Sequence, residues 1–302
     1  IDKWLNEAEE NGEIAIDTET SSLNSHQTKL VGISFSTKIG KACYIPIGHT
    51  KGKNLEEKKV ITKIKPILED RSIKKIGQNI KFDYIVFYHR GIDMNAMEDT
   101  MLMSYALDAG KNRHNMNLLS EIHLNHKTIT FKELVGTGKK QINFSEVKID
   151  LAKDYAAEDA DITFRLYKIF IKSLKIEKLI NIYEIFEKPL IKILAQMEIS
   201  GIKVDKKFLQ VLSSKFEKKI SNLEKEIYKI SNKEFKIGST KQLGEVMYNE
   251  MKISSLKKTK KGSYATSAQV LEDLAFKGHK LPKLVLDWRQ VTKLKNTYSD
   301  SL

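Results

Sequence analysis

Two carboxylates separated by one residue are the part of this 302-residue sequence that most directly suggests chemistry. Asp17 and Glu19 follow a short apolar run, 14–16, which has the composition of a buried strand. Residues i and i+2 of an extended segment point to the same side, so both carboxylates face one region of space. Two negative charges held together are costly unless a cation neutralises them. The pair therefore predicts a metal site, although a lone Asp-x-Glu triplet is a weak signal because most are solvated.

Three more residues, which come later in the chain, extend this pattern. Asp83 lies in the first turn of a helix expected over 80–89, where the helix dipole also favours a negative charge. Tyr155 and Asp159 are four residues apart, so they share one face of a helix expected over 150–174. Small alanines around them leave room for a substrate to approach. Hard oxygen ligands of this kind suit Mg²⁺ or Mn²⁺.

The elements that must position these residues indicate a mixed α/β fold. The first three strands are expected to form an antiparallel meander with the first strand central, and Pro46 favours an edge or a strand end for the third. Three strands followed by helices and further short strands resemble the ribonuclease H-like architecture. Strands are expected over 13–17, 29–35, 41–47 and 74–77, and further helices over 55–70 and 99–108.

The second part of the chain differs from the first in charge. Residues 1–175 carry 27 Lys or Arg against 24 Asp or Glu, whereas residues 176–302 carry 25 against 15. Most of the net charge of +13 therefore lies in the second part, and such a field attracts nucleic acid. We expect two domains, 1–175 and 176–302. The second is expected to be helical over 206–230, 267–276 and 284–294, and rich in loops over 232–261.

Composition excludes several other classes of protein. No apolar run reaches the roughly 18 residues that span a bilayer, and residues 1–4 lack the features of a signal peptide. The single cysteine, Cys43, allows no internal disulfide and no cysteine-based zinc site. His123 and His126 are interpreted as structural. A cytoplasmic protein of bacterial type, with no membrane partner, is expected.

The ordered acidic residues and the segments around them resemble a known family. They are similar to the three motifs of the proofreading 3′-5′ exonucleases, in the subclass that uses a tyrosine. The surrounding segments resemble the bacterial DNA polymerase I family, also called family A DNA polymerases, and this resemblance covers essentially the whole chain. The segments that carry it are 16–23, 77–83, 126–131, 155–161, 239–243 and 294–298.

The resemblance implies a fold, a reaction and a cofactor. The fold is a ribonuclease H-like exonuclease domain followed by a mostly helical, thumb-like subdomain. The reaction is hydrolysis of the 3′-terminal phosphodiester of single-stranded or frayed DNA, with release of 5′-mononucleotides. Two divalent cations, Mg²⁺ or Mn²⁺, would be held by Asp17, Glu19, Asp83 and Asp159, with Asp17 shared between them. Tyr155 and Glu19 would orient the attacking water.

The resemblance also implies positions that contact DNA. Single-stranded DNA would be contacted by Thr20, Leu23, Gln78, Asn79 and Phe131, although Leu23 and Phe131 could equally be core residues. In the second part, residues 206–261 contain fifteen lysines and six acidic residues, and lysine clusters bind phosphate without reading sequence. Duplex DNA would be contacted by Ser239, Thr240, Lys241, Lys257, Lys258, Lys260, Lys261, Arg289 and Lys293.

The family's polymerase carboxylates lie further toward the C-terminus than this sequence extends. We therefore expect a monomeric fragment with an exonuclease domain and a thumb but no palm or fingers, from a parent protein that polymerises DNA. Two alternatives remain open at this point. One is an RNA-trimming exonuclease similar to ribonuclease D, and the other is a catalytically silent DNA-binding platform that retains the fold.

Overall fold

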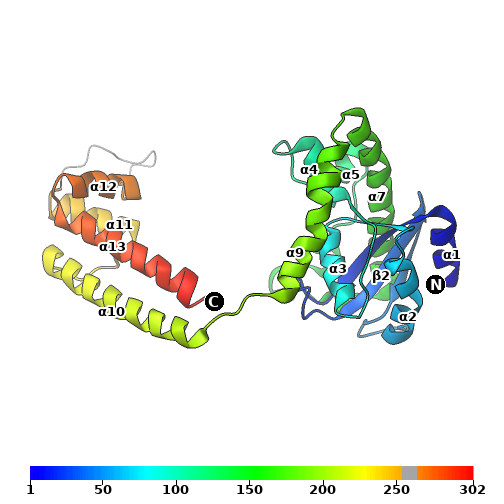
Figure 1. Cartoon of the computed structure of the whole chain (residues 1–302). Helices are drawn as coiled ribbons and strands as arrows, with labels where there is room; N and C mark the ends of the chain where they lie inside the picture. Colours follow the sequence, from blue (N-terminus) through cyan, green and yellow to red (C-terminus); the bar gives the residue numbers. More distant parts are fainter. Residues whose placement is uncertain (254–263, 302) are drawn as a thin grey trace. The chain divides into compact units, whose positions relative to one another are not determined.

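The computed structural model describes residues 1–253 and 264–301, which form two compact units, 1–201 and 202–302 (Figure 1). Among the described residues, no helix is both long and apolar enough to cross a membrane. The first unit contains a five-stranded mixed sheet covered by helices on both faces, and the second is helical. The predicted fold class is therefore confirmed.

The sheet of the first unit has the strand order β3-β2-β1-β4-β5, so β1 is central and β3 is an edge, as predicted. β1 pairs antiparallel with β2, which pairs antiparallel with β3. On its other side β1 runs parallel to β4, and β4 runs parallel to β5. The strands span Glu13–Thr20 (β1), Leu30–Lys38 (β2), Lys41–Pro46 (β3), Lys74–Gly77 (β4) and Met97–Asp99 (β5).

Alternation along β1 divides its side chains between two cores. Ile14 and Ile16 are fully buried with α1, α2, α3 and α9, whereas Ala15 is buried with α4, α5 and α7. Odd-numbered residues of β1 therefore face α7. The first group of helices spans Asp2–Asn11 (α1), Glu57–Glu69 (α2), Ile80–Tyr88 (α3) and Lys188–Ser200 (α9). The second spans Thr100–Asp108 (α4), Met116–Leu124 (α5) and Ile149–Ile176 (α7).

The helical segments between residues 180 and 200 belong to the first unit. Ile180–Ile182 (α8) and a π-helical segment, Tyr183–Glu187, lead into α9, which packs beside α3 (Figure 1). Two buried residues of α9, Ile191 and Ala195, belong to the same core as Ile14. The compact unit consequently extends past the boundary expected at residues 175 and 176, because α9 presents an apolar face that the charge pattern does not reveal.

The second unit is built on a long helix, Lys206–Ser231 (α10), close to the predicted 206–230. Ala268–Phe276 (α12) and Lys280–Leu294 (α13) also match their predictions, and π-helical residues Lys295–Ser299 follow. The segment expected to be rich in loops differs, because Thr240–Gly244 (α11) and the π-helical residues Glu245–Glu250 are helical. Their apolar side chains at helical spacing, Leu243, Val246 and Met247, are buried in the core of this unit.

Candidate active site

The first carboxylates of the site come from the end of β1. Asp17 and Glu19 continue the odd-numbered face on which Ala15 packs toward α7, so both point away from the core that contains Ile16. Glu19 is buried and Asp17 is half-buried. The register of β1 against β2 shifts between Glu19 and Thr20, so regular pairing is interrupted next to the site. The strand therefore presents both acids at the point where it leaves the sheet.

α7 supplies the facing side of the site. It crosses β1, β2, β3 and β4, and its buried alanines at positions 152, 156 and 160 allow close approach to the sheet. Asp159 is buried, and one oxygen each from Asp17, Glu19 and Asp159 lie within 4.8 Å of one another. Tyr155, one turn earlier, lines the same cleft. The spacing of four predicted from the sequence therefore brings a hydroxyl and a carboxylate to these acids.

Asp83 approaches from α3 and is tied to β1. Its Oδ1 accepts hydrogen bonds from the Thr18 backbone N–H, at 3.0 Å, and from the Thr18 hydroxyl, at 2.5 Å. The Asp83 side chain is buried and lines the cleft, but it is not among the three acids whose oxygens cluster. One side of this carboxylate is therefore used to fix its position beside the cluster.

The start of α3 is fixed by a residue that the sequence interpretation did not single out. Asp99, which is buried, accepts hydrogen bonds from the backbone N–H groups of Asn79 and Ile80, both at 3.0 Å. It also accepts from Met101 and Leu102 at the start of α4. One carboxylate thus caps two helices, and Asn79 takes a left-handed conformation with φ of 60°. Asp99 precedes an apolar helix, which is the signal for an N-cap.

Burial and mutual repulsion oppose ionisation of all four carboxyls. Burial raises the pKa of Asp17 to about 6. Burial, and then the charges of its acidic neighbours, raise the pKa of Glu19 well above its usual range. The pKa of Asp83 and the pKa of Asp159 are raised for the same two reasons, with Asp17 as the main neighbouring charge. Within the part of the chain that the structure describes, no Lys, Arg or His forms an ion pair with them.

This donor set fits a divalent cation. Buried carboxylates that lack a cationic side chain need a positive charge to ionise together, and clustered oxygen ligands are those preferred by hard cations. The fourth acid, Asp83, is buried and lines the same cleft. The geometry therefore suits metal-assisted hydrolysis of a phosphodiester.

The acids open into a cleft of about 580 Å³. Leu23 is 95% exposed and Phe131 is 44% exposed, so neither is a core residue, and both line the cleft. Phe131 begins the short helix Phe131–Val135 (α6), and its ring lies nearly parallel to Phe144, 6.2 Å away. The structure brings the five positions expected to contact single-stranded DNA to this one cleft, namely Thr20, Leu23, Gln78, Asn79 and Phe131.

Further residues line the cleft that the sequence interpretation missed. Phe82 lies beside Asp83, and Met116 and Phe144 add apolar surface. Asn143 donates a hydrogen bond of 2.7 Å from its Nδ2 to the Ser21 carbonyl, and so connects the two sides of the cleft. An aromatic residue such as Phe144 is only a weak indication of a base-stacking site in a sequence. The hydrogen bond between Asn143 and Ser21 joins residues 122 positions apart, so no local sequence pattern predicts it.

The residues expected to contact duplex DNA lie in the second unit. Ser239 caps α11 by accepting a hydrogen bond from Gln242 N–H, and Thr240 and Lys241 form the first turn, exposed. Arg289 and Lys293 lie on α13, where Arg289 Nη1 donates to the Thr266 carbonyl at 2.7 Å and Lys293 is exposed. The remaining predicted positions, Lys257, Lys258, Lys260 and Lys261, lie outside the described residues.

The sheet order, the acidic cluster and the tyrosine fit a nuclease domain of the metal-dependent type. A family model described as 3′-5′ exonuclease matches residues 1–175, and this chain belongs to that family. A second model, described as DNA polymerase family A, matches residues 206–302. Residues 1–175 are accordingly a 3′-5′ exonuclease domain, and the family implies the use of a divalent metal, which the acidic cluster fits.

The chain is also similar to bacterial DNA polymerase I enzymes. DNA polymerase I of Rhizobium leguminosarum is 42% identical over all of this chain, which covers 32% of that protein. The Pseudomonas aeruginosa enzyme is 38% identical over all of this chain, which covers 34% of it. This chain therefore spans about a third of the length of these relatives.

A solved structure supports the fold. It is described as the POL domain of Pol1 from M. smegmatis in complex with DNA primer-template and dNTP. It matches with a TM-score of 0.78 at 23% identity, over 98% of this chain and 47% of that one.

Proposed function

We propose that this chain removes nucleotides one at a time from the 3′ end of single-stranded or frayed DNA and releases 5′-mononucleotides. The observation that carries the proposal is the cluster of Asp17, Glu19 and Asp159, whose oxygens lie within 4.8 Å of one another beside Tyr155 and an open cleft. A silent platform would have no need of Glu19, Asp83 and Asp159, three buried acids whose pKa values are raised by burial and by the charge of Asp17. The cleft is lined by exposed apolar side chains, which suits base stacking without sequence preference.

Two divalent cations, Mg²⁺ or Mn²⁺, would be held by Asp17, Glu19 and Asp159 at one position and by Asp17 and Asp83 at the other. When bound, they supply a water of lowered pKa and stabilise negative charge on the departing 3′ oxygen. Tyr155 and Glu19 would orient the attacking water. Thr18 keeps Asp83 in place through two hydrogen bonds.

The remaining residues of the cleft hold the DNA strand. Leu23 and Phe131 line the cleft from segments that are far apart in the sequence, and they would contact the terminal bases. Gln78 and Asn79, on the turn that Asp99 fixes, would contact the sugar-phosphate backbone. Thr20, at the end of β1, would contact the terminal nucleotide.

The second unit is proposed to bind duplex DNA through phosphate contacts. Its support is its basic charge, with 22 Lys or Arg against 11 Asp or Glu in residues 202–302, and the match of 206–302 to the family A DNA polymerase model. Ser239, Thr240, Lys241, Arg289 and Lys293 are the described positions proposed for these contacts. We propose sequence domains at 1–175 and 176–302, and a parent protein that polymerises DNA in the bacterial cytoplasm. A monomeric state stays a prediction.

Asp17→Ala tests the site directly. Loss of the shared ligand should remove several kcal/mol of transition-state stabilisation, on the order of a thousandfold or more in rate. The exposed Asp154, on the same helix as Asp159, provides a control, and Asp154→Ala should remain fully active. Near wild-type Mg²⁺-dependent activity in purified Asp17→Ala would show that the site is assigned wrongly.

The direction of degradation can be read from end-labelled oligonucleotides. A 5′-labelled DNA strand should give a descending ladder, and a blocked 3′ end should stop degradation whereas a blocked 5′ end should not. Early release of the 5′ label would contradict the proposed direction. Equal cleavage of a matching RNA strand would favour the alternative of an RNA-trimming enzyme.

A further inference from the structure

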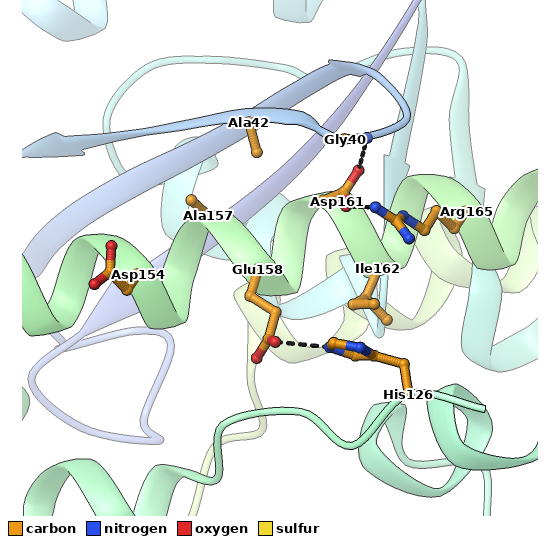
Figure 2. A pocket seen from close by; sticks show the side chains of 9 residues that line it. All are labelled: Gly40, Ala42, His126, Asp154, Ala157, Glu158, Asp161, Ile162 and Arg165. Atoms are coloured by element: carbon orange, nitrogen blue, oxygen red, sulfur yellow. Dashed lines mark hydrogen bonds and ion pairs between the residues drawn. The ribbon is translucent and has the colours of Figure 1, made fainter. Parts of the chain in front are cut away.

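Glu158 lies between Tyr155 and Asp159 in the sequence of α7, but it does not line the cleft. Figure 2 shows that Glu158 and Asp161 leave α7 in different directions, Asp161 toward Gly40 and Glu158 toward His126. Together they line a separate hollow of about 320 Å³. Tyr155 and Asp159 are used by the proposed reaction, whereas Glu158 is not, so its role requires a separate explanation.

The Glu158 carboxylate is fully engaged by one loop. Its Oε1 lies 2.8 Å from His126 Nε2, and its Oε2 accepts a hydrogen bond of 2.7 Å from the Ile129 backbone N–H. His126 is in turn attached to α5, because the Ser120 hydroxyl donates to the His126 carbonyl at 2.9 Å. The segment between α5 and α6 is therefore attached to α7 by a single carboxylate that uses both oxygens.

The loop that Glu158 holds leads directly to Phe131. Thr130 caps α6 with its hydroxyl, which accepts from Glu133 N–H, and the Glu133 carboxylate accepts from Thr130 N–H. Because this capping box fixes Phe131 relative to Ile129, anchoring Ile129 on α7 also sets the position of the Phe131 ring. That ring lies 6.4 Å from the ring of Tyr155, which is on the same helix as Glu158.

We infer that Glu158 is a positioning residue that holds the Phe131 ring in place relative to α7. It thereby affects how tightly the 3′-terminal base binds in the cleft. The inference rests on the proposed function. Glu158 does not line the cleft and is not one of its three clustered acids, although its charge also raises the pKa of the neighbouring Asp159. The test must therefore separate an effect through the loop from an effect of this charge. An incorrectly placed stacking ring weakens substrate binding more than it slows hydrolysis of bound substrate, since the carboxylate cluster stays intact.

A double-mutant cycle on two substrates tests this inference. Glu158→Ala, Phe131→Ala, the double variant and the control Asp154→Ala are compared on a single-stranded oligonucleotide with a normal 3′ base and on one with an abasic 3′ nucleotide. On the normal strand, Glu158→Ala should lower kcat/KM on the order of tenfold, mainly through KM, because stacking of one base on an aromatic ring is worth roughly 5- to 150-fold in binding. The double variant should be no worse than Phe131→Ala, and on the abasic strand Glu158→Ala should equal wild type.

Other outcomes would overturn the inference. Multiplicative losses in the double variant, or an equal loss on the abasic strand, would show that Glu158 acts on Asp159 by its charge and not through Phe131. Glu158→Gln separates the two effects and is available if Glu158→Ala does not fold, because it removes the charge while its amide oxygen can still accept from Ile129. Its KM on the normal strand should stay close to that of wild type, and a large loss on both strands would overturn the inference. An inactive wild type would instead refute the proposed function, which keeps the two failures distinguishable.

Discussion

Asp17→Asn should make the metal-free exonuclease domain more stable at neutral pH while it abolishes hydrolysis. In the folded protein burial raises the pKa of Asp17 to about 6 from its ordinary value of 3.8, so folding opposes its ionised form. A difference of this size corresponds to about 3 kcal/mol against the folded state. Because Asp17 is half-buried, this figure is an upper bound. Removing the charge also relieves repulsion on Glu19, Asp83 and Asp159.

The sign of the pH dependence follows from the raised pKa. Below the unfolded value of 3.8, Asp17 is neutral in both states and costs nothing. Between 3.8 and about 6 the unfolded chain ionises first, so the stability of the wild type falls with rising pH. Above about pH 6 Asp17 is ionised in both states, and the full destabilisation of the folded protein is present. The gain from Asp17→Asn should therefore be small near pH 4 and largest at about pH 7.5.

Thermal unfolding of the wild type, Asp17→Asn and the control Asp154→Asn, in the presence of a chelator, measures this gain. For a unit of this size about 1 kcal/mol shifts Tm by roughly 2–4 °C, so an increase of several degrees is expected at neutral pH. Added Mn²⁺ should raise the Tm of the wild type by mass action and leave Asp17→Asn nearly unchanged. A lower Tm for Asp17→Asn at neutral pH, or a gain that does not depend on pH, would refute the reasoning.

Two other changes have expected outcomes. Tyr155→Phe should reduce kcat on the order of a hundredfold, less than Asp17→Ala, because it removes one hydroxyl that orients water and leaves the carboxylates in place; single-turnover rates on one oligonucleotide measure this, and a loss equal to that of Asp17→Ala would contradict it. The second change replaces four lysines by Ala, namely Lys257, Lys258, Lys260 and Lys261. It should lower the slope of log duplex affinity against log salt concentration by roughly 0.9 per lost phosphate contact, with little change in single-strand cleavage. Fluorescence anisotropy across a salt series measures the slope, and an unchanged slope would mean that these lysines do not contact DNA.

The parts of the fold with a strong local period could be predicted from the sequence. The strand that carries Asp17 and the long helix that carries Asp159 lie within a few residues of their predicted limits. The i,i+2 spacing on β1 and the i,i+4 spacing on α7 indicate which side chains share a face of each element. In the structure these two faces meet. Whether Leu23 and Phe131 are exposed could not be decided from the sequence, because apolar residues suit both a core and a stacking surface.

What the sequence could not predict depends on distant contacts. The helix at residues 2–11 and the strand at 97–99 are too short or too polar to give a clear pattern. The capping of α3 by Asp99 joins segments 20 residues apart, and only the parallel pairing of β4 with β5 brings them together. The packing of α9 on the first unit has the same origin, since its partner surface lies on α3.

Glu19 and Asp159 meet in space although 140 residues separate them in the sequence. A chain emerging from the ribosome therefore carries β1 for most of the synthesis of this unit without the helix that completes its acidic cluster. Contacts between such distant segments form late and slowly, so nuclease activity begins only when α7 has been made and has docked on the sheet. An unfinished or truncated chain that lacks α7 would expose two of the acids and yet be unable to degrade nucleic acid in the cell that makes it.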